Sequence, residues 1–261
     1  MKAIYHSKQK NYRLRKENIM YSFDKKTLFI ILLIMAISSI VGGQRTIEGI
    51  IYSLPGVIVA MTFHEFAHAW AATKLGDDTP RLQGRLNLNP LSHIDPIGLL
   101  CLIFLGFGWG KPVEINPRNF NRKKSMSAQE ALVAFAGPAM NLIIAIILTV
   151  ISFCLLKFAP SFVLFNRVGT IINIMLDMAI VVNIGLGIFN LVPLPPLDGS
   201  KILMHFLPYN ARNWFVSNQN IFYIVFLVIW ITGAVGYIIS PIINIVYVGF
   251  YSAIGWIFGL F

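Results

Sequence analysis

The sequence predicts an all-α polytopic membrane protein with about six transmembrane helices and a short re-entrant or interfacial β-hairpin region. Of the 261 residues, 56% are hydrophobic and only 12% are charged, and the mean hydropathy is +0.70. Soluble domains are about half apolar and about a quarter charged. The apolar residues also fall in long runs separated by short basic stretches, as membrane-spanning helices require. These runs occupy most of the chain and leave no room for a separate soluble domain of ordinary size.

The chain is predicted to consist of two regions. Residues 1–26 form a polar, basic tail, and residues 27–261 are expected to form one membrane-embedded domain. The first span is predicted at Thr27–Val41. Because the basic region before it is longer than that of a cleaved signal peptide, we expect an uncleaved anchor.

Five further apolar segments are expected to form helices in or at the membrane. They are Ile47–Ala72, Gln129–Phe158, Thr170–Leu194, Ile221–Ile239 and Ile242–Phe261. Pro241 is expected to separate the last two, because proline removes a backbone hydrogen bond and disrupts a helix sterically. The final segment is therefore predicted either to cross as a sixth span or to lie at the interface.

The stretch at 73–128 is mixed in composition and is not expected to cross the bilayer. Within it, Ile97–Gly108 is apolar but only about a dozen residues long, which suits a re-entrant or interfacial structure. Arg81–Asn89 shows partial alternation of apolar and polar residues, and Lys111–Asn116 is also typical of a strand. These two segments are predicted to form the small β-hairpin.

The distribution of basic residues predicts the orientation. If the N-terminus is cytosolic and each span crosses once, 18 of the 21 Lys and Arg residues lie on the cytosolic side. The positive-inside rule favours this arrangement, which predicts a multi-pass protein of the cell membrane. It also explains the net charge of +10 without nucleic acid, since no basic stripe alternates with exposed aromatics. The expected partner is the lipid bilayer.

The apolar segment Ile47–Ala72 contains the pattern His-Glu-x-x-His at His64, Glu65 and His68. In a helix, residues i and i+4 lie on one face, so the two imidazoles can share one tetrahedral metal ion. Glu65 lies beside that face and can hold a water molecule, as in zinc hydrolases. Each ionisable group at mid-membrane costs roughly 2.5–3.5 kcal/mol, which favours compensation by a bound cation. Alternatively, the three groups face a water-filled vestibule and satisfy one another.

A catalytic zinc site needs a third protein ligand and leaves its fourth position for water. The candidate is Asp198, which follows directly on an apolar span. Three prolines before it end regular helix, and non-helical backbone at membrane depth is tolerated where it lines a site. The predicted topology brings Asp198 to the same cytosolic side as His68. Alternatively, Asp198 is a loop residue that caps the helix after it.

The two metal motifs, at 64–68 and 190–199, resemble those of the site-2 protease family of intramembrane zinc metalloproteases. Three more segments are similar to the small bacterial branch of that family, namely Gly84–Gly98, Gly108–Val113 and Ala136–Asn141. The resemblance covers about residues 50–203, and no inserted PDZ domain is visible in the sequence. It implies a zinc metalloendopeptidase that hydrolyses membrane-spanning protein or peptide substrates near the cytosolic face.

The resemblance also implies roles for individual residues. One Zn2+ per chain is expected to be held by His64, His68 and Asp198, with Glu65 as the general base. Asn190 is expected to be catalytic, close to the substrate or its oxyanion. The alternative for Asn190 is a hydrogen bond to the broken backbone that follows it.

The predicted β-hairpin suggests how a substrate is held. A helical substrate must unwind before attack, and the hairpin edge can bind the unwound chain as an added strand. Leu86, Asn87 and Leu88 are therefore candidate substrate-binding residues, unless this loop only packs at the headgroups. Asn141 is a further candidate, although an interhelical hydrogen bond is its first expectation.

Two other functions remain open at this point. The first is a membrane transporter or ion-translocating protein with an intramembrane metal site, because ionisable groups and broken helices in membranes also mark ion paths. The sequence contains no internal repeat, and the His-Glu-x-x-His spacing favours a hydrolytic base. The second is a catalytically silent adaptor, against which the complete catalytic set argues. The sequence carries no signal for an oligomeric state.

Overall fold

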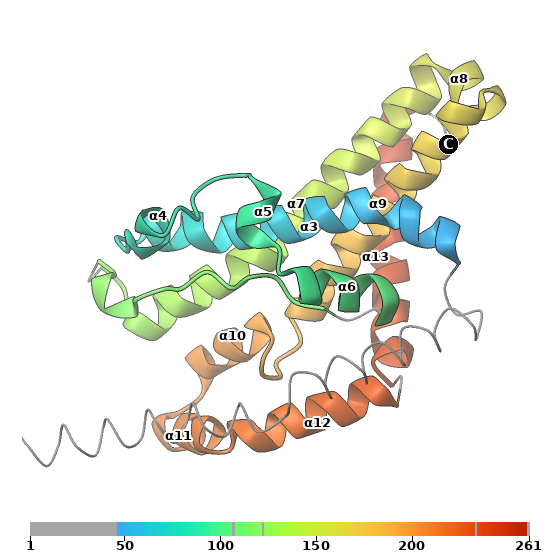
Figure 1. The fold of residues 1–261 in the computed structure, drawn as a ribbon. Coiled ribbons are helices and arrows are strands. Elements are labelled where there is room, and N and C mark those ends of the chain that lie inside the picture. Colours follow the sequence, from blue (N-terminus) through green and yellow to red (C-terminus); the bar gives the residue numbers. More distant parts are fainter. Residues whose placement is uncertain (1–45, 106–107, 122, 233, 260–261) are drawn as a thin grey trace, which may run out of the picture.

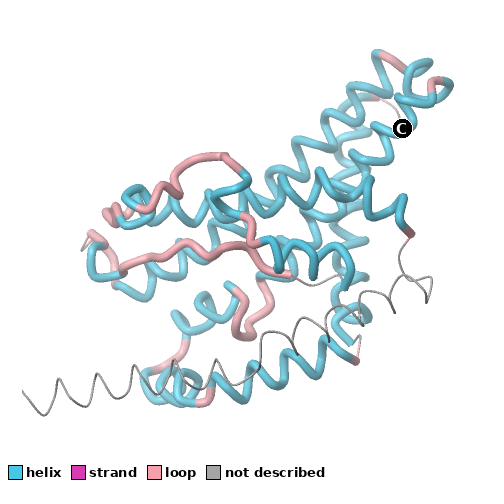
Figure 2. Tube along the Cα trace, in the orientation of Figure 1, coloured by secondary structure: helices cyan, strands magenta, loops and turns pink. Residues whose placement is uncertain are grey.

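The computed structural model describes residues 46–105, 108–121, 123–232 and 234–259, so the basic tail and the predicted span at 27–41 lie outside the described residues. Within them the fold is all-helical, as predicted (Figure 1, Figure 2). The helices are α3 (Ile47–Lys74), α4 (Thr79–Leu82), α5 (Pro90–His93), α6 (Pro96–Leu105), the short 3-10 helix η1 (Pro117–Asn119), α7 (Met126–Phe158), α8 (Pro160–Phe165), α9 (Arg167–Asn190), α10 (Asp198–Phe206), α11 (Tyr209–Ser217), α12 (Gln219–Ile231) and α13 (Ala234–Phe258).

Four of the described helices are long and apolar enough to cross a membrane. They are α3, α7, α9 and the part of α13 from Gly236 to Phe258. The first three confirm the helices predicted at 47–72, 129–158 and 170–194, with shifts of a few residues at their ends. The described residues therefore support a polytopic membrane protein with four spans, and the predicted count of six is not confirmed.

The prediction around Pro241 is wrong. Helix α12 ends at Ile231, and α13 runs from Ala234 through Pro241 to Phe258 without a break there. The span predicted at 221–239 is thus divided before Pro241, and the final span begins earlier than 242. A proline inside a membrane helix is tolerated because neighbouring groups and small local adjustments satisfy the backbone carbonyl that it leaves free.

Polar side chains define where the long helices begin. The hydroxyl of Thr46 accepts a hydrogen bond from the Gly49 N–H at 3.1 Å, and Ser125 caps α7 in the same way. The Asn166 side chain caps α9 through the N–H groups of Val168 and Gly169. Each cap satisfies amide groups that would otherwise be orphaned at a helix N-terminus.

Helices α3, α7 and α9 pack against one another and form the centre of the molecule. Small residues allow the close approach: a Cβ atom added to Gly56 of α3 would lie 2.5 Å from the Ala179 Cα of α9. Ala60, Ala67 and Ala69 of α3 are also buried. Such small-residue contacts are typical of helix pairs in membranes, where association depends on close packing.

Helix α13 covers the other side of α7 and α9 (Figure 1). A buried cluster of Ala145, Ile180 and Ile184 receives aromatic and aliphatic side chains of α13, including Tyr247 and Phe250. This contact anchors the last span to the central three helices.

The predicted β-hairpin is not confirmed, because the described residues contain no β-strand. Arg81–Asn89 contains the end of α4 and then irregular turns. One isolated antiparallel bridge pairs Ile94 with Gly110. The 81–89 loop is joined to the 111–116 segment instead by a buried side chain, since Arg85 donates a hydrogen bond to the Pro112 carbonyl at 3.1 Å. In the apolar stretch predicted at 97–108, the described residues up to Leu105 belong to the ten-residue helix α6, which is too short to span a bilayer.

Helices α10 to α12 connect the centre to α13. Asp198 opens α10 directly after the proline-rich turn that ends α9. Helices α11 and α12 lie along the lower edge of the molecule in Figure 1, away from the central helices. At 13 residues, α12 falls short of the length that a span needs.

Candidate metal centre

The three side chains predicted to bind a metal meet at one point. His64 and His68 come from α3, and Asp198 comes from the start of α10, 134 residues after His64. The two Nε2 atoms lie 3.1 Å apart, and each lies 3.1 Å from Oδ2 of Asp198. All three residues are buried, with exposed fractions of 5%, 7% and 8%. Two motifs far apart in sequence therefore form one compact cluster.

The geometry of this cluster fits a tetrahedral zinc ion. Zinc lies about 2.0–2.2 Å from histidine nitrogens and carboxylate oxygens, so two ligand atoms of a tetrahedron lie about 3.3–3.5 Å apart. The three separations of 3.1 Å are close to that value. Two imidazoles and one carboxylate are also a donor set that catalytic zinc takes, with a fourth position left for water.

The tautomer of the neutral His68 imidazole is set by its neighbour on α7. Its Nδ1 atom lies 2.8 Å from the backbone carbonyl oxygen of Val133. A carbonyl only accepts, so Nδ1 carries the proton and donates it. In the neutral imidazole the Nε2 lone pair then faces the cluster, which is the tautomer that binds a metal through Nε2.

Asn141 fixes His64 in the same way. The Nδ1 atom of His64 lies 2.6 Å from Asn141 Oδ1. The Asn141 amide nitrogen donates to the Ala60 carbonyl at 3.0 Å and to Asn183 Oδ1 at 3.2 Å, so its oxygen is the atom that faces the imidazole. Two Nε2 lone pairs and a carboxylate oxygen at 3.1 Å repel one another unless a positive charge, a proton or a metal ion, lies among them.

One stripe of α7 supports both histidines. Val133, Gly137 and Asn141 follow each other at intervals of four and share a helix face. The outer two hold His68 and His64 respectively. Between them, a Cβ atom at Gly137 would lie 2.5 Å from His68 Nε2 and 2.7 Å from His64 Cε1. Only glycine leaves room for the two imidazoles at this position.

The proline-rich turn positions Asp198. A Cβ atom at Gly199 would lie 2.3 Å from the Leu191 carbonyl oxygen and 2.4 Å from that of Val192, so the chain packs closely against the end of α9. Burial acts to raise the pKa of the Asp198 carboxyl, but attraction to the imidazole of His68 in its protonated form and the hydrogen bonds from both imidazoles outweigh it and hold the pKa below its usual range. The carboxylate is therefore ionised, as a metal ligand must be.

Glu65 lies beside the cluster, under an extended segment. Its Oε2 atom accepts a hydrogen bond from the Val113 N–H at 3.2 Å. A Cβ atom at Gly110 would lie 3.1 Å from Glu65 Oε1, so this glycine brings the backbone close to the carboxylate. The sequence predicts Glu65 next to the metal but gives no indication that the 110–113 segment covers it.

The remaining predicted site residues have other contacts. Asn190 donates to the Leu186 carbonyl at 3.0 Å, within its own helix. The Asn87 side chain bonds to the Gly84 carbonyl and accepts from the Asn89 N–H, within a turn. Leu88 is 49% exposed. Asn141 is completely buried and faces His64, which agrees with the predicted interhelical hydrogen bond.

Sequence reasoning missed three supporting groups. The Val133 carbonyl carries no residue-type signal, because any residue supplies one. Asn183 is fully buried on α9 and stands behind Asn141. Gly137 lies in the segment 136–141 that resembles the family, but the sequence indicated no contact of this glycine with the histidines. The spacing of four between Gly137 and Asn141 repeats that of His64 and His68, and this match was the available signal.

The geometry defines a class of protein, in which helices of membrane length and an adjoining short helix form a zinc-binding triad with a further carboxylate beside it. Comparison with known proteins identifies the family within this class. The chain belongs to the site-2 protease family, since the family model described as “Peptidase family M50” matches residues 52–233. It is thus a membrane zinc metallopeptidase with Zn2+ as its metal.

The names of similar curated proteins agree with this family assignment. The chain is 37% identical over 195 residues to “Putative zinc metalloprotease YwhC” of Bacillus subtilis (strain 168), a match that covers 74% of this chain and 86% of the relative. It is 30% identical over 164 residues to “Putative zinc metalloprotease Rip2” of Mycolicibacterium smegmatis (strain ATCC 700084 / mc(2)155), covering 61% and 59%. The Mycobacterium tuberculosis (strain ATCC 25618 / H37Rv) protein of the same name is 27% identical over 214 residues, covering 79% and 70%. No solved structure matches the chain.

Proposed function

We propose that this protein cleaves peptide bonds of membrane-embedded protein or peptide substrates, close to the cytosolic face of the cell membrane. The observation that carries the proposal is the buried triangle of His64, His68 and Asp198, built on and beside apolar helices of membrane length. We expect a buried site among helices of membrane length to be reached by a substrate that is itself in the membrane. The family membership supports peptide hydrolysis as the reaction.

Glu65 is proposed as the general base. When bound by the triad, zinc supplies Lewis acidity that polarises the scissile carbonyl and acidifies a water molecule. Glu65 then accepts a proton from the attacking water and delivers it to the leaving amine. Its hydrogen bond from Val113 holds the carboxylate on the side of the extended 110–113 segment. A peptide lying along that segment would have its scissile bond next to Glu65.

Asn190 is proposed to act on the substrate carbonyl or the developing oxyanion. Its position at the end of α9, in the same motif as Asp198, supports this role. The bond from its amide to the Leu186 carbonyl must be exchanged for one to the substrate. If that bond is permanent, Asn190 instead stabilises the end of the helix.

The orientation and the domain limits are part of the proposal. We expect a cytosolic N-terminus, a basic tail at 1–26 and a membrane domain at 27–261, because the basic residues gather on one side of the predicted spans. A count of six spans needs the segment 27–41 and a crossing by α12, which has 13 residues. Protection of an N-terminal tag from protease in inside-out vesicles would contradict this orientation.

Leu86, Asn87 and Leu88 are proposed to contact the substrate from the loop that Arg85 ties to Pro112. The exposure of Leu88 supports a contact surface here. With no strand in this loop, the contact would be made by side chains rather than by an added strand. Leu86→Ser together with Leu88→Ser is expected to raise KM, and unchanged cleavage would remove the loop from the proposal.

The test is cleavage of a model substrate in a bilayer. The full chain is purified, loaded with zinc and reconstituted in liposomes with a fluorescent single-span peptide, and the products are identified by mass spectrometry. We expect cuts at the cytosolic end of the span in the wild type and none with Glu65→Gln. Zinc-loaded protein that cuts no bilayer peptide but conducts ions in a liposome flux assay would favour the translocation alternative. Cleavage confined to soluble peptides would reject a membrane-embedded substrate.

A further inference from the structure

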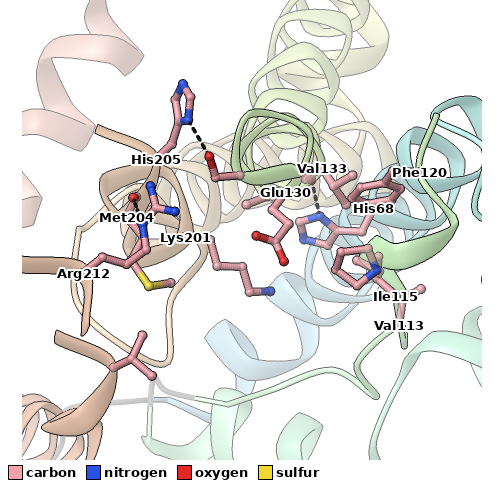
Figure 3. Close-up of a pocket in the computed structure, with 14 residues that line it drawn as sticks. His68, Val113, Ile115, Phe120, Glu130, Val133, Lys201, Met204, His205 and Arg212 are labelled. Carbon is pink, nitrogen blue, oxygen red and sulfur yellow. Dashed lines mark hydrogen bonds between the residues drawn. The ribbon is translucent and has the colours of Figure 1, made fainter. Parts of the chain in front are cut away.

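A cavity of about 450 Å³ opens beside the metal centre, with His68 in its wall (Figure 3). Its other walls come from the first turns of α7, from α10 and α11, and from the extended segment before and through η1. Apart from His68, none of its lining residues belongs to the metal triad or to the proposed catalytic pair. The cavity is large enough for one or two amino-acid side chains of a bound peptide.

One wall is apolar and suits the stem of a side chain. Val113, Ile115 and Pro117 line the cavity at every second position. Alternate residues of an extended chain point to one face, so this face of the segment is turned towards the cavity. The N–H of Val113 bonds to Glu65, so the same segment borders both the general base and the cavity.

The opposite wall is positively charged. It carries Lys201, Arg212 and His205, and Figure 3 shows Lys201 and Glu130 directed into the space near His68. Glu130 is the one carboxylate among the lining residues. Among the lining residues, two permanent cations therefore face this single anion, which leaves them with a net positive charge.

Contacts within this wall hold two of the basic side chains in place. Arg212 Nε donates to the Met204 carbonyl at 3.0 Å, which ties α11 to α10 and leaves the two terminal nitrogens outside that bond. The His205 Nδ1 lies 3.2 Å from the Ser127 hydroxyl of α7. Lys201 Nζ lies 3.9 Å from Asp198 Oδ1, so this lysine forms an ion pair with a metal ligand and links the wall to the metal centre.

We propose that this cavity is a specificity subsite for an acidic substrate residue close to the scissile bond, whose carboxylate is bound by Arg212 and Lys201. A guanidinium with two terminal nitrogens available matches a carboxylate in geometry and charge. A basic substrate residue would be repelled by the two cations, and an apolar residue would exclude water from them without supplying a compensating charge or hydrogen bond. The inference rests on the proposed peptidase function and adds the substrate class.

The test uses a single-span peptide library with four randomised positions next to the cytosolic end of the span. Wild-type protein in liposomes cuts the library, and the residues around each cut are read by mass spectrometry. We expect Asp and Glu to be enriched at one position, with about tenfold loss of that enrichment in Arg212→Glu, the size expected for one charge-assisted hydrogen bond. Glu130→Gln removes the competing anion and should strengthen the preference.

Controls separate charge from folding. Arg212→Lys also loses the bond to Met204 but keeps the charge, so it should retain most of the preference. Lys74→Glu changes an exposed cation at the end of α3, outside the cavity, and should leave the preference for acidic residues unchanged. The subsite would be overturned if the wild type cut the library without enrichment of Asp and Glu. It would also be overturned if Arg212→Glu showed the same enrichment as the wild type.

A binding measurement distinguishes failure of the subsite from failure of catalysis. The library is captured on immobilised, zinc-loaded Glu65→Gln protein, with or without Arg212→Glu. Acidic enrichment that depends on Arg212 supports the subsite even if the wild type cuts nothing. Captured peptides without acidic enrichment, or no capture at all, would reject it independently of the reaction.

Discussion

The Nδ1 atom of His64 lies 2.6 Å from Oδ1 of Asn141, and this bond joins α3 to α7 beside the metal ligands. Asn141 in turn donates to Asn183, so a chain of amides from α9 through α7 orients the imidazole. Histidine ligands in metal sites commonly donate their second ring N–H to such a partner, which fixes the tautomer and the ring orientation.

Replacing Asn141 by leucine should weaken zinc binding. The variant keeps the volume but leaves the buried Nδ1–H of His64 without an acceptor, and loss of such a partner typically costs about 10–100-fold in metal affinity. Zinc affinity is measured by competition with a chromogenic chelator. Asn173→Leu removes another amide from α9, one bonded to Ser152 and Asp177 rather than to the metal site, and should leave the affinity unchanged. Equal affinities in both variants would contradict the role of Asn141.

A methyl group at Gly137 should disrupt the site. The added Cβ would lie 2.5 Å from His68 Nε2, so the imidazoles or α7 must move, and misplacement by about 1 Å can cost about a hundredfold in rate. Gly137→Ala is therefore expected to lose zinc and activity together. The matched control is Gly185→Ala in α9, where the nearest atom, Ile243 Cδ1, lies at an ordinary 3.5 Å. Normal zinc content in Gly137→Ala would show that the close contact is not required.

Glu65→Gln should separate metal binding from catalysis. The amide keeps the size of the side chain and cannot accept the proton of an attacking water, so cleavage should fall by about 10²–10⁴-fold while zinc content stays normal. Cleavage rate and bound zinc are measured on the same preparation. Substantial activity in this variant would assign the base elsewhere.

The loop after α3 should make the protein sensitive to acid. Asp77 is fully buried and accepts hydrogen bonds from Thr79, from the Asn116 N–H at 2.7 Å and from Asn119 at 2.9 Å. Burial acts to raise the pKa of Asp77, but these bonds outweigh it and lower the pKa below the usual value. The stabilisation is complete above about pH 4, the ordinary pKa of aspartate, and is lost as the pH falls through the depressed pKa of the folded protein.

The corresponding measurement is the thermal midpoint in detergent from pH 7 to pH 3. Asp77→Asn should lower the midpoint at neutral pH by about 3 °C or more and flatten its fall below pH 4. Asp78→Asn, at the exposed neighbour of Asp77, is the control and should leave the curve close to that of the wild type. An identical acid profile in Asp77→Asn would exclude this carboxylate as the cause.

The long helices were predictable because each carries its own signal. Stretches of some twenty predominantly apolar residues identify α7 and α9 without reference to the rest of the chain. The same holds for His64 and His68, whose spacing is local. Asp198 was expected at the same metal ion because an unpaired carboxylate next to an apolar span is energetically unfavourable. In the structure its Oδ2 lies 3.1 Å from the Nε2 atoms of both imidazoles.

The features that were missed depend on tertiary contacts. The alternation in Arg81–Asn89 suggested a strand, but the buried Arg85 holds this loop through carbonyl groups of Ser92 and Pro112 instead. Pro241 was expected to end a helix, yet α13 continues through it, since helix propensity weighs less within a packed bundle. The Val133 carbonyl could not be found from sequence because its role comes only from the place where α7 crosses α3.

The central claim is that two distant motifs form one zinc site. The most direct test is zinc content per chain after mild chelator dialysis, compared between the wild type, Asp198→Ala and Glu65→Gln. We expect about one zinc in the wild type and in Glu65→Gln, and a clear loss in Asp198→Ala. Equal zinc in wild type and Asp198→Ala would remove Asp198 from the site, and no zinc in any of the three would contradict the metal centre itself.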